Sequence, residues 1–481
     1  MTPAAVLGGA SEARPRVSFL MMVAVTGLLA AELYYGWIAV SQQASHHTFP
    51  HDVGLIDYSL HWTLHGRFMY SPLIGRSHFG VHFTPTLLLA LPFYALHDAP
   101  VTLLLFQSVL LAGAAAPLFL LARHATDSRA LAALTAGLYL VNYYVGCIHQ
   151  ASHYEALLPF CAFSAMYCAL AGHRRAYWIF LVLTLGVKTD VALYLVPFGL
   201  YLLLARQERR LGWGTMGLSL AWFLLAAAVT RAFAPAGATP AYLKFYGVYG
   251  NSLPAIALDI LAHPWRIPLS LISWPLLTLL ATCGFLFLAD WRSALLILPP
   301  AAVVLLSPDP DFRMLAYYRS APIIPFLFFA TALGAARFAR GPRPAKGPLI
   351  VFMAALLAVN GAVWLTQPTL SNGFPMRPFE VTARERAAAD IARRLLPPDG
   401  RLAVQWDLYC QVPHRAEIVL LDDYAEADYL FMDMKGNLGT TPPAVAWPAL
   451  REARENMEIL ADEDGLILAR RRAPPRTEHA Y

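Results

Sequence analysis

The stretch 17-VSFLMMVAVTGLLAAELYYGWIAV-40 is a long, almost unbroken apolar run near the start of the chain. It exceeds the roughly 20 residues that an α-helix needs to cross a bilayer. Arg14 and Arg16 precede it, and no clear small-residue cleavage site follows it. The core of a signal peptide is shorter than this run, so we expect an uncleaved first membrane span.

The composition extends this interpretation to most of the chain. Of the 481 residues, 58% are hydrophobic and 14% are charged, whereas about a quarter of the residues of a soluble domain are charged. We therefore expect a mainly α-helical, polytopic membrane protein. The apolar runs predict about eleven spans: 17–40, 100–122, 130–148, 153–172, 177–188, 190–205, 212–233, 266–287, 293–307, 320–336 and 348–366.

The net charge and the cysteines exclude other classes of protein. A net charge of +5 is small for this length and does not indicate a nucleic-acid partner. The positive charge is better explained by basic loops that set the membrane topology. The five cysteines form no CxxC motif, so the sequence predicts neither a disulfide framework nor a cysteine-based zinc site.

The basic clusters also predict the orientation. If they face the cytoplasm, the N-terminus is cytoplasmic, and loop 41–99 and the tail 367–481 lie on the outer side. The apolar piece 83–97 is short and carries Pro85 and Pro92, so we expect an interfacial or re-entrant helix there. Nearly every unusual polar residue then lies at the outer surface, which favours a functional site on that face.

Two domains are expected, a membrane domain over 1–366 and a small α/β domain over 367–481. The tail loses the long apolar runs and shows helix and strand patterns instead. Its expected elements are an amphipathic helix over 379–398, strands over 401–406, 417–421 and 428–433, and a hairpin over 457–471.

The first outer loop contains the polar stretch 48-TFPHDVGLIDYSLHWTLHGRF-68. Its apolar spacing predicts an amphipathic helix lying flat on the membrane. Asp52 lies at the helix start, where a carboxylate either caps the helix or, facing a cavity, acts as a general base.

The same stretch carries a possible metal stripe. Asp57, His61 and His65 recur at i, i+4 and i+8, a spacing at which two histidines can share one ion. No further strong set of ligands appears in the sequence, so we favour a polar helix face hydrogen-bonded to loops. We assign no metal ligand and no definite cofactor, although a divalent cation remains open.

Other polar residues interrupt the apolar runs close to the outer surface. A glutamate at the top of a span is costly unless it is paired or lines a cavity. Lys188 has two interpretations: it binds a phosphate, or it pairs with Asp190 or Glu155. The residues concerned are His82, His153, Glu155, Lys188, Asp190, Tyr318 and Arg319.

Taken in order, these motifs resemble the bacterial membrane-protein family catalogued as domain of unknown function 2079. The resemblance covers roughly residues 48 to 470. It rests on HDVGLIDYSLHWTLHG, VHFTPTLLLALPFYAL, SHYEALLPF, KTDVALYLVPFGLYLL, YYRSAPIIPFLF and the tail piece 404-VQWDLYCQVPHRAEIVLLDDYAEADYLFMD-433. That family is similar to the C-type glycosyltransferases, which are polytopic enzymes that use a lipid-phosphate sugar donor.

The resemblance implies a glycosyltransferase of the bacterial inner membrane. It would transfer a sugar from a polyprenyl-phosphate donor to an envelope acceptor by an inverting single displacement. Asp52 matches the acidic residue of the family's first outer loop and is implied as the catalytic base. We expect Lys188, with help from Arg319 or a histidine, to bind and stabilise the departing phosphate. The implied pocket residues are His82, His153, Glu155, Asp190 and Tyr318.

Two other kinds of protein remain open. A membrane transporter or lipid-handling protein also places polar residues at broken helices. However, no internal repeat is found, and the polar residues lie at one surface rather than at mid-depth. A non-catalytic relative that scaffolds envelope enzymes would keep the fold without turnover.

Overall fold

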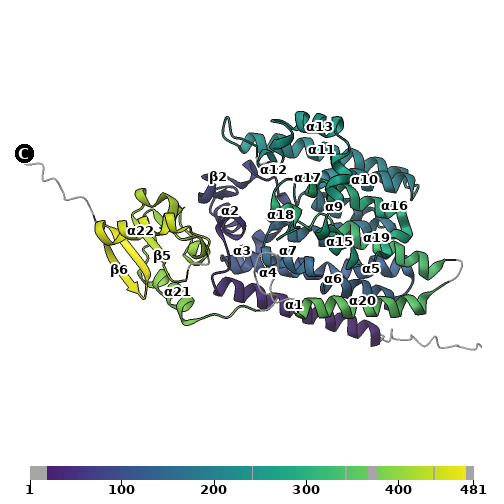
Figure 1. Ribbon diagram of the computed structural model, residues 1–481, viewed down its shortest axis with the longest axis horizontal. Coiled ribbons are helices and arrows are strands. Elements are labelled where there is room, and N and C mark those ends of the chain that lie inside the picture. Colours follow the sequence, from purple (N-terminus) through teal and green to yellow (C-terminus); the bar gives the residue numbers. More distant parts are fainter. Residues whose placement is uncertain (1–18, 241, 342–343, 367–377, 437–438, 473–481) are drawn as a thin grey trace, which may run out of the picture.

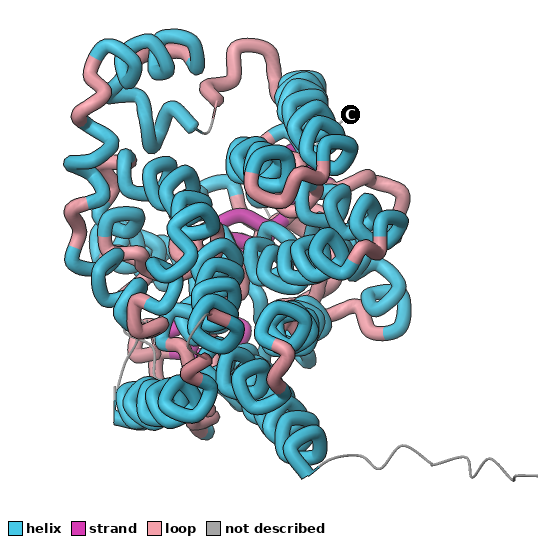
Figure 2. The backbone as a smooth tube through the Cα atoms, turned by 90° about the vertical axis from the view of Figure 1, so that its right-hand side faces the viewer, coloured by secondary structure: helices cyan, strands magenta, loops and turns pink. Residues whose placement is uncertain are grey.

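The computed structural model describes residues 19–472 except 241, 342–343, 367–377 and 437–438 (Figure 1). Residues 19–366 form a bundle of helices, the membrane region, and residues 378–472 form a C-terminal α/β region at one end of it. The chain is thus a mainly helical membrane protein with a small C-terminal sheet, as the sequence predicts. Figure 2 shows how few strands accompany the helices.

The membrane region consists of helices of very unequal length. They are α1 (Phe19–Ala44), α2 (Leu55–Leu64), α3 (Leu91–Leu96), α4 (Pro100–Gly113), α5 (Ala115–Thr126), α6 (Arg129–Leu140), α7 (Tyr143–Ala151), α8 (Leu158–Ala171), α9 (Arg174–Leu185), α10 (Val191–Leu204), α11 (Arg209–Phe233), α12 (Tyr242–Tyr246), α13 (Leu253–Ala262), α14 (Arg266–Leu271), α15 (Trp274–Ala281), α16 (Trp291–Ala294), α17 (Leu298–Leu306), α18 (Pro310–Arg313), α19 (Ile324–Arg340) and α20 (Lys346–Thr366).

Several helices are long and apolar enough to cross a membrane. Within the described residues there are five of them, or six if α6 and α7, which meet at a 49° bend, form one span. The five are Pro100–Thr126, Tyr154–Ala171, Arg209–Phe233, Leu286–Leu306 and Lys346–Thr366. The count of about eleven spans stays a prediction, because several of the predicted spans correspond to shorter helices.

One predicted span is not a continuous helix. Residues 266–287 divide into α14 and α15, because the chain turns at Ser273. The Ser273 side chain accepts a hydrogen bond from the backbone N–H of Leu276, and Pro275 lies in the first turn of α15. This is an ordinary N-cap with a proline just inside the helix.

The helix within loop 41–99 is covered by protein. It begins as a π-helix, η1 (Pro50–Gly54), and continues as α2. All residues from Leu55 to Leu60 are buried, including Asp57 and Ser59 on the polar side. The expectation of a helix lying flat on the membrane is therefore wrong, because the C-terminal region packs over it: the Tyr58 and Tyr409 ring centroids are 5.4 Å apart.

The proline-rich piece after this helix is a short, two-part helix, as predicted. A 3₁₀-helix, η4 (Pro85–Ala90), runs directly into α3. The Thr86 hydroxyl donates to the backbone oxygen of Leu183, which joins the piece to the end of α9.

The C-terminal region is a five-stranded mixed sheet of order β4-β3-β5-β7-β6. Parallel pairing joins β4, β3 and β5, and the antiparallel hairpin β6–β7 extends the sheet from β5. The predicted strands and hairpin are all present. The elements are α21 (Ala383–Leu395), β3 (Leu402–Val404), β4 (Ile418–Leu420), β5 (Tyr429–Asp433), α22 (Pro443–Asn456), β6 (Met457–Glu463) and β7 (Leu466–Arg471).

The C-terminal region and the membrane region share one apolar core. A single cluster of buried side chains contains Ile56 and Leu60 of α2 together with Leu408 and Tyr409 of η9 (Trp406–Gln411). Polar contacts cross the same boundary: Gln43 Nε2 donates to the backbone oxygen of Cys410 at 2.7 Å. The tail therefore holds the segment that carries Asp52.

Candidate functional site

Lys188 is the centre of an ion-pair network between three helices. It lies in the turn between α9 and α10, and its Nζ contacts Glu155 Oε1, in the 3₁₀ turn η5 (Tyr154–Leu157) that opens α8. A second carboxylate, Asp190 Oδ2, is 3.6 Å from the same Nζ. The Glu155 side chain is 2% exposed, and such burial of a carboxylate requires a paired cation. The ion-pair interpretation of Lys188 is thus what the structure shows.

Asp190 has an incomplete set of partners. Tyr194, one turn further along α10, donates its hydroxyl to Asp190 Oδ2 at 2.7 Å. The other carboxylate oxygen, Oδ1, is buried and has no hydrogen-bond partner among the described residues. An unsatisfied buried acceptor is uncommon and is suited to a donor group on a ligand.

A second group of the predicted residues stacks nearby. The imidazole of His153 lies parallel to the Tyr318 ring, with centroids 3.7 Å apart and an interplanar angle of 5°. The Arg319 guanidinium lies over the Tyr318 ring at 4.4 Å and over the Phe312 ring at 3.9 Å. These contacts fix the plane of the guanidinium without neutralising its charge.

Arg319 differs from Lys188 because it lacks a carboxylate partner. No ion pair joins it to any described residue within 4.0 Å, and its buried Nε has no hydrogen-bond acceptor there. The loop before it holds two non-glycine residues, Leu315 and Tyr317, with φ of 51° and 52°. Left-handed backbone of this kind is costly and is concentrated at functional sites.

Asp52 belongs to η1, and Arg319 acts on it electrostatically. Burial raises the pKa of the Asp52 carboxyl to about 6, and the positive charge of Arg319 opposes this rise. Asp52 does not cap α2: Gly54 is the N-cap residue there, and no side chain caps that end. The capping interpretation is therefore wrong, and the side chain is left half-buried without a hydrogen bond to the described residues.

A group of aromatic and histidine side chains, His78, His82 and Tyr154, lies beside Asp52 and Arg319. The His82 and Tyr154 ring centroids are 5.7 Å apart, and those of His78 and Tyr154 are 5.8 Å apart. Burial, with the nearby cations Lys188 and Arg319, keeps the pKa of His82 well below its usual range. Both ring nitrogens of His78 and the Tyr154 hydroxyl are buried without partners among the described residues.

The predicted site residues thus fall into one neighbourhood. Lys188, Glu155 and Asp190 form the ion-pair network, whereas His153, Tyr318 and Arg319 form the stack. Sequence reasoning missed three members: His78, Tyr154 and Tyr194. Each of the first two lies beside a chosen residue in the motifs RSHFGVHF and SHYE, so proximity in sequence was the available signal.

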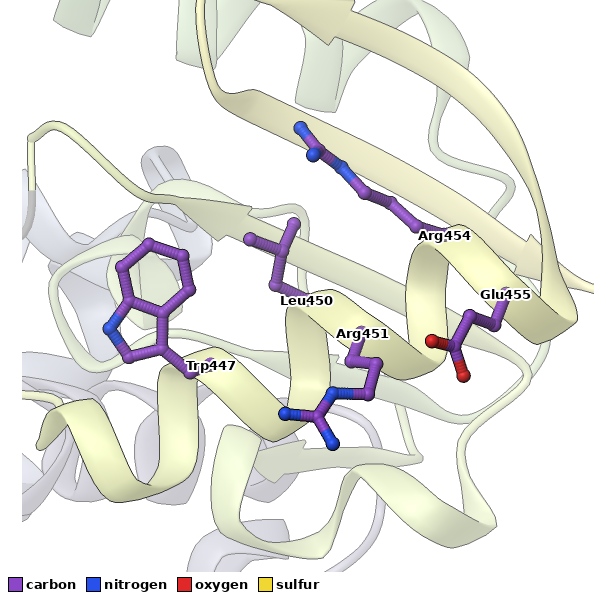
Figure 3. Close-up of a pocket in the computed structure, with 5 residues that line it drawn as sticks. All are labelled: Trp447, Leu450, Arg451, Arg454 and Glu455. Atoms are coloured by element: carbon purple, nitrogen blue, oxygen red, sulfur yellow. The ribbon is translucent and has the colours of Figure 1, made fainter.

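Two hollows on the described surface lie away from these residues. One, of 330 Å³, is lined by Trp447, Leu450, Arg451, Arg454 and Glu455 along α22 (Figure 3). It is a shallow recess beside one helix with mixed charges. We place the candidate site by its buried charges and unsatisfied polar atoms instead.

The fold is similar to that of a solved membrane protein, ArnT. It matches the crystal structures of ArnT from Cupriavidus metallidurans, in the apo state with a TM-score of 0.54 and 13% identity, and bound to undecaprenyl phosphate with a TM-score of 0.50 and 14% identity. In both, the match covers 93% of this chain and 97% of the ArnT chain. No curated protein sequence matches.

The particular family is shown by the sequence. Residues 48–468 match the family described as predicted membrane protein (DUF2079), so the chain belongs to that family. The matched region includes most of loop 41–99, the ion-pair network and most of the C-terminal sheet. The resemblance stated from the motifs is confirmed.

Proposed function

We propose that this protein is an integral membrane glycosyltransferase that moves a sugar from a polyprenyl-phosphate donor to an acceptor of the cell envelope. The observation that carries the proposal is that Arg319, which has no carboxylate within 4.0 Å among the described residues, acts electrostatically on Asp52, a carboxyl without a hydrogen bond to those residues. A phosphate and an acceptor hydroxyl are the ligands that these two groups lack. The distant likeness to an ArnT structure that holds undecaprenyl phosphate agrees with this class of donor.

The donor phosphate is assigned first to Arg319. A guanidinium presents several N–H donors in one plane and binds phosphate oxygens well. Lys188 already has two carboxylates within 4.0 Å, so it contributes positive potential beside the phosphate. Glu155 and His153 hold Lys188 and Tyr318 in position and shape the sugar pocket.

Asp52 is assigned as the general base of an inverting displacement. It takes the proton of the acceptor hydroxyl while that oxygen attacks the anomeric carbon. The bond from the anomeric carbon to the phosphate oxygen breaks on the opposite face, and polyprenyl phosphate leaves with the bonding electrons. A base with a pKa of about 6 is largely ionised at neutral pH and still accepts a proton readily.

The lipid chain is assigned to the short helix η4–α3. Its large apolar side chains are exposed, with Leu89 at 46%, Phe93 at 50% and Leu96 at 86%. Exposed apolar groups of this size favour contact with hydrocarbon. The helix is also hydrogen-bonded to the end of α9, close to Lys188 in the sequence.

The orientation completes the proposal. With the N-terminus in the cytoplasm, loop 41–99 and the domain 367–481 lie outside the inner membrane, where that domain can select the acceptor. A topology reporter fused at Asn372 is expected to read extracytoplasmic. A cytoplasmic signal would contradict this orientation.

Turnover of the donor tests the reaction. Purified protein is incubated with a panel of polyprenyl-phosphate hexoses and pentoses and with envelope extracts, and release of polyprenyl phosphate is followed. We expect release with at least one sugar and none with Asp52→Asn. A protein that binds these lipids but releases no polyprenyl phosphate would instead be a non-catalytic scaffold, and one that moves them across vesicles would be a transporter.

A further inference from the structure

A second cluster of polar side chains lies apart from the residues used above. His61 of α2, Asp98 just before α4 and His414 of the C-terminal region offer nitrogen and oxygen atoms that all lie within 4.8 Å of one another. His61 Nδ1 is 2.7 Å from Asp98 Oδ2, and His414 Nδ1 is 3.6 Å from Asp98 Oδ1. Two imidazoles from different parts of the chain thus face one carboxylate.

A carboxylate on the side of the ring away from Asp98 fixes the orientation of His414. Its Nε2 is 2.7 Å from Asp57 Oδ2, and Asp57 is 1% exposed. The other oxygen of Asp57 accepts a hydrogen bond from the Tyr94 hydroxyl at 3.0 Å. A carboxylate behind a histidine in this way makes Nε2 the protonated nitrogen and turns the lone pair of Nδ1 toward the opposite side.

As a result, the contact between His414 and Asp98 is not a hydrogen bond. His414 Nδ1 faces the Asp98 carboxylate at 3.6 Å, which is too long for a direct hydrogen bond. A cation between them would satisfy both atoms. The side chains of His61 and His414 are only 13% and 12% exposed, and that of Asp98 is 31% exposed, so the cluster is sheltered but open to solvent.

We propose that His61, Asp98 and His414 bind a divalent transition metal, with zinc as the best match. Imidazole nitrogens and one carboxylate suit Zn²⁺ and disfavour Mg²⁺ or Ca²⁺, which prefer oxygen ligands. Tetrahedral zinc with bonds of about 2.0–2.1 Å places its ligand atoms about 3.3 Å apart. Small side-chain rotations bring the cluster to that spacing, and water completes the coordination.

The metal would fasten the C-terminal region to the first outer loop. Its ligands come from α2, from the turn before α4 and from the loop after η9, and 353 positions separate His61 from His414. The same two segments already meet through Gln411 Nε2, which donates to Thr48 Oγ1 at 3.2 Å. The metal is thus structural and lies outside the proposed transfer reaction.

Zinc binding by the full-length protein tests this site without any sugar donor. The protein carries a tag without histidine, is purified in detergent, stripped with a chelator and titrated with Zn²⁺ against a competing indicator. We expect one tight equivalent, which His61→Ala, His414→Ala and Asp98→Asn abolish. His65→Ala is the matched control: this exposed histidine lies one turn beyond His61 on the same helix, stacked on it at 4.3 Å, and the variant should keep the equivalent.

Two further readouts separate a metal site from a hydrogen-bonded cluster. Asp57→Asn keeps all three ligands and is expected to weaken zinc affinity about 10–100-fold. The unfolding temperature should rise with Zn²⁺ in the wild type and not in Asp98→Asn, since only a ligand bound to the folded state stabilises it. No zinc uptake by the wild type, or equal loss in His65→Ala and His61→Ala, would overturn the proposal.

Discussion

Replacing Asp52 with asparagine is expected to abolish transfer and, at the same time, to stabilise the protein. Burial raises the pKa of Asp52 from 3.8 to about 6, so the folded protein disfavours the charged form. The cost is absent well below pH 3.8, grows between that value and about pH 6, and levels off above it. Asparagine carries no charge and avoids this cost.

The magnitude follows from the two pKa values. The free-energy penalty of holding the charged carboxyl in the fold is about 3 kcal/mol at pH 7.5 and about 1 kcal/mol at pH 4.5. Asp52→Asn should therefore unfold at a higher temperature than the wild type at pH 7.5, and the difference should shrink at pH 4.5. Loss of the general base lowers the transfer rate by about 10²–10⁴-fold.

The assay pairs two measurements on the same detergent-purified protein. Thermal unfolding is followed at both pH values, and release of polyprenyl phosphate is followed at pH 7.5. Asp311→Asn is the matched control, because that carboxylate is exposed in the short helix α18 before Arg319 and should change neither measurement. A variant that loses stability at pH 7.5 along with activity would show Asp52 to be a structural residue and would refute the reasoning.

The remaining predictions concern the ion pairs, the packing and the pH profile. Glu155→Gln should lower the free energy of unfolding by about 1–3 kcal/mol, because Lys188 keeps only Asp190; denaturant unfolding measures it. Gly334→Val should cost about 1–3 kcal/mol, because a Cβ there overlaps the backbone oxygen of Leu286, whereas Gly217→Ala, with open space around it, should not destabilise. The acid limb of kcat should lie at higher pH than that of kcat/KM, as measured by initial rates from pH 5 to 8.

Local patterns were enough to predict the apolar helices and the strands of the tail. They also contained the signal for the break at Ser273, a serine two positions before Pro275, which the hydropathy of 266–287 concealed. Helix α22 was missed because Pro448 lies inside it, and a proline within a helical pattern is usually taken to end the helix. These are features of neighbouring residues, so a closer reading of the sequence recovers them.

Contacts between distant segments were beyond the sequence. The expected surface helix over 48–68 is buried because Tyr409, more than 340 positions later, packs against Tyr58. Likewise, the spacing of Asp57, His61 and His65 offered a metal stripe on one helix face, although the favoured interpretation was a polar face hydrogen-bonded to loops. The structure instead divides them, since Asp57 orients His414 while His61 faces Asp98. The partner of a polar helix face depends on tertiary packing, and the periodicity of the sequence does not reveal it.

The carboxylates around the two cations of the candidate site give Lys188 and Arg319 different roles. Lys188 is held between Glu155 and Asp190, so it is not free to bind the phosphate directly and adds only positive potential beside it. Arg319 has no such partner and lowers the pKa of Asp52 in the absence of substrate. A phosphate bound to Arg319 would offset that influence, and the pKa of Asp52 would then rise. The base would thus become stronger once the donor is bound, which is when the acceptor hydroxyl must lose its proton.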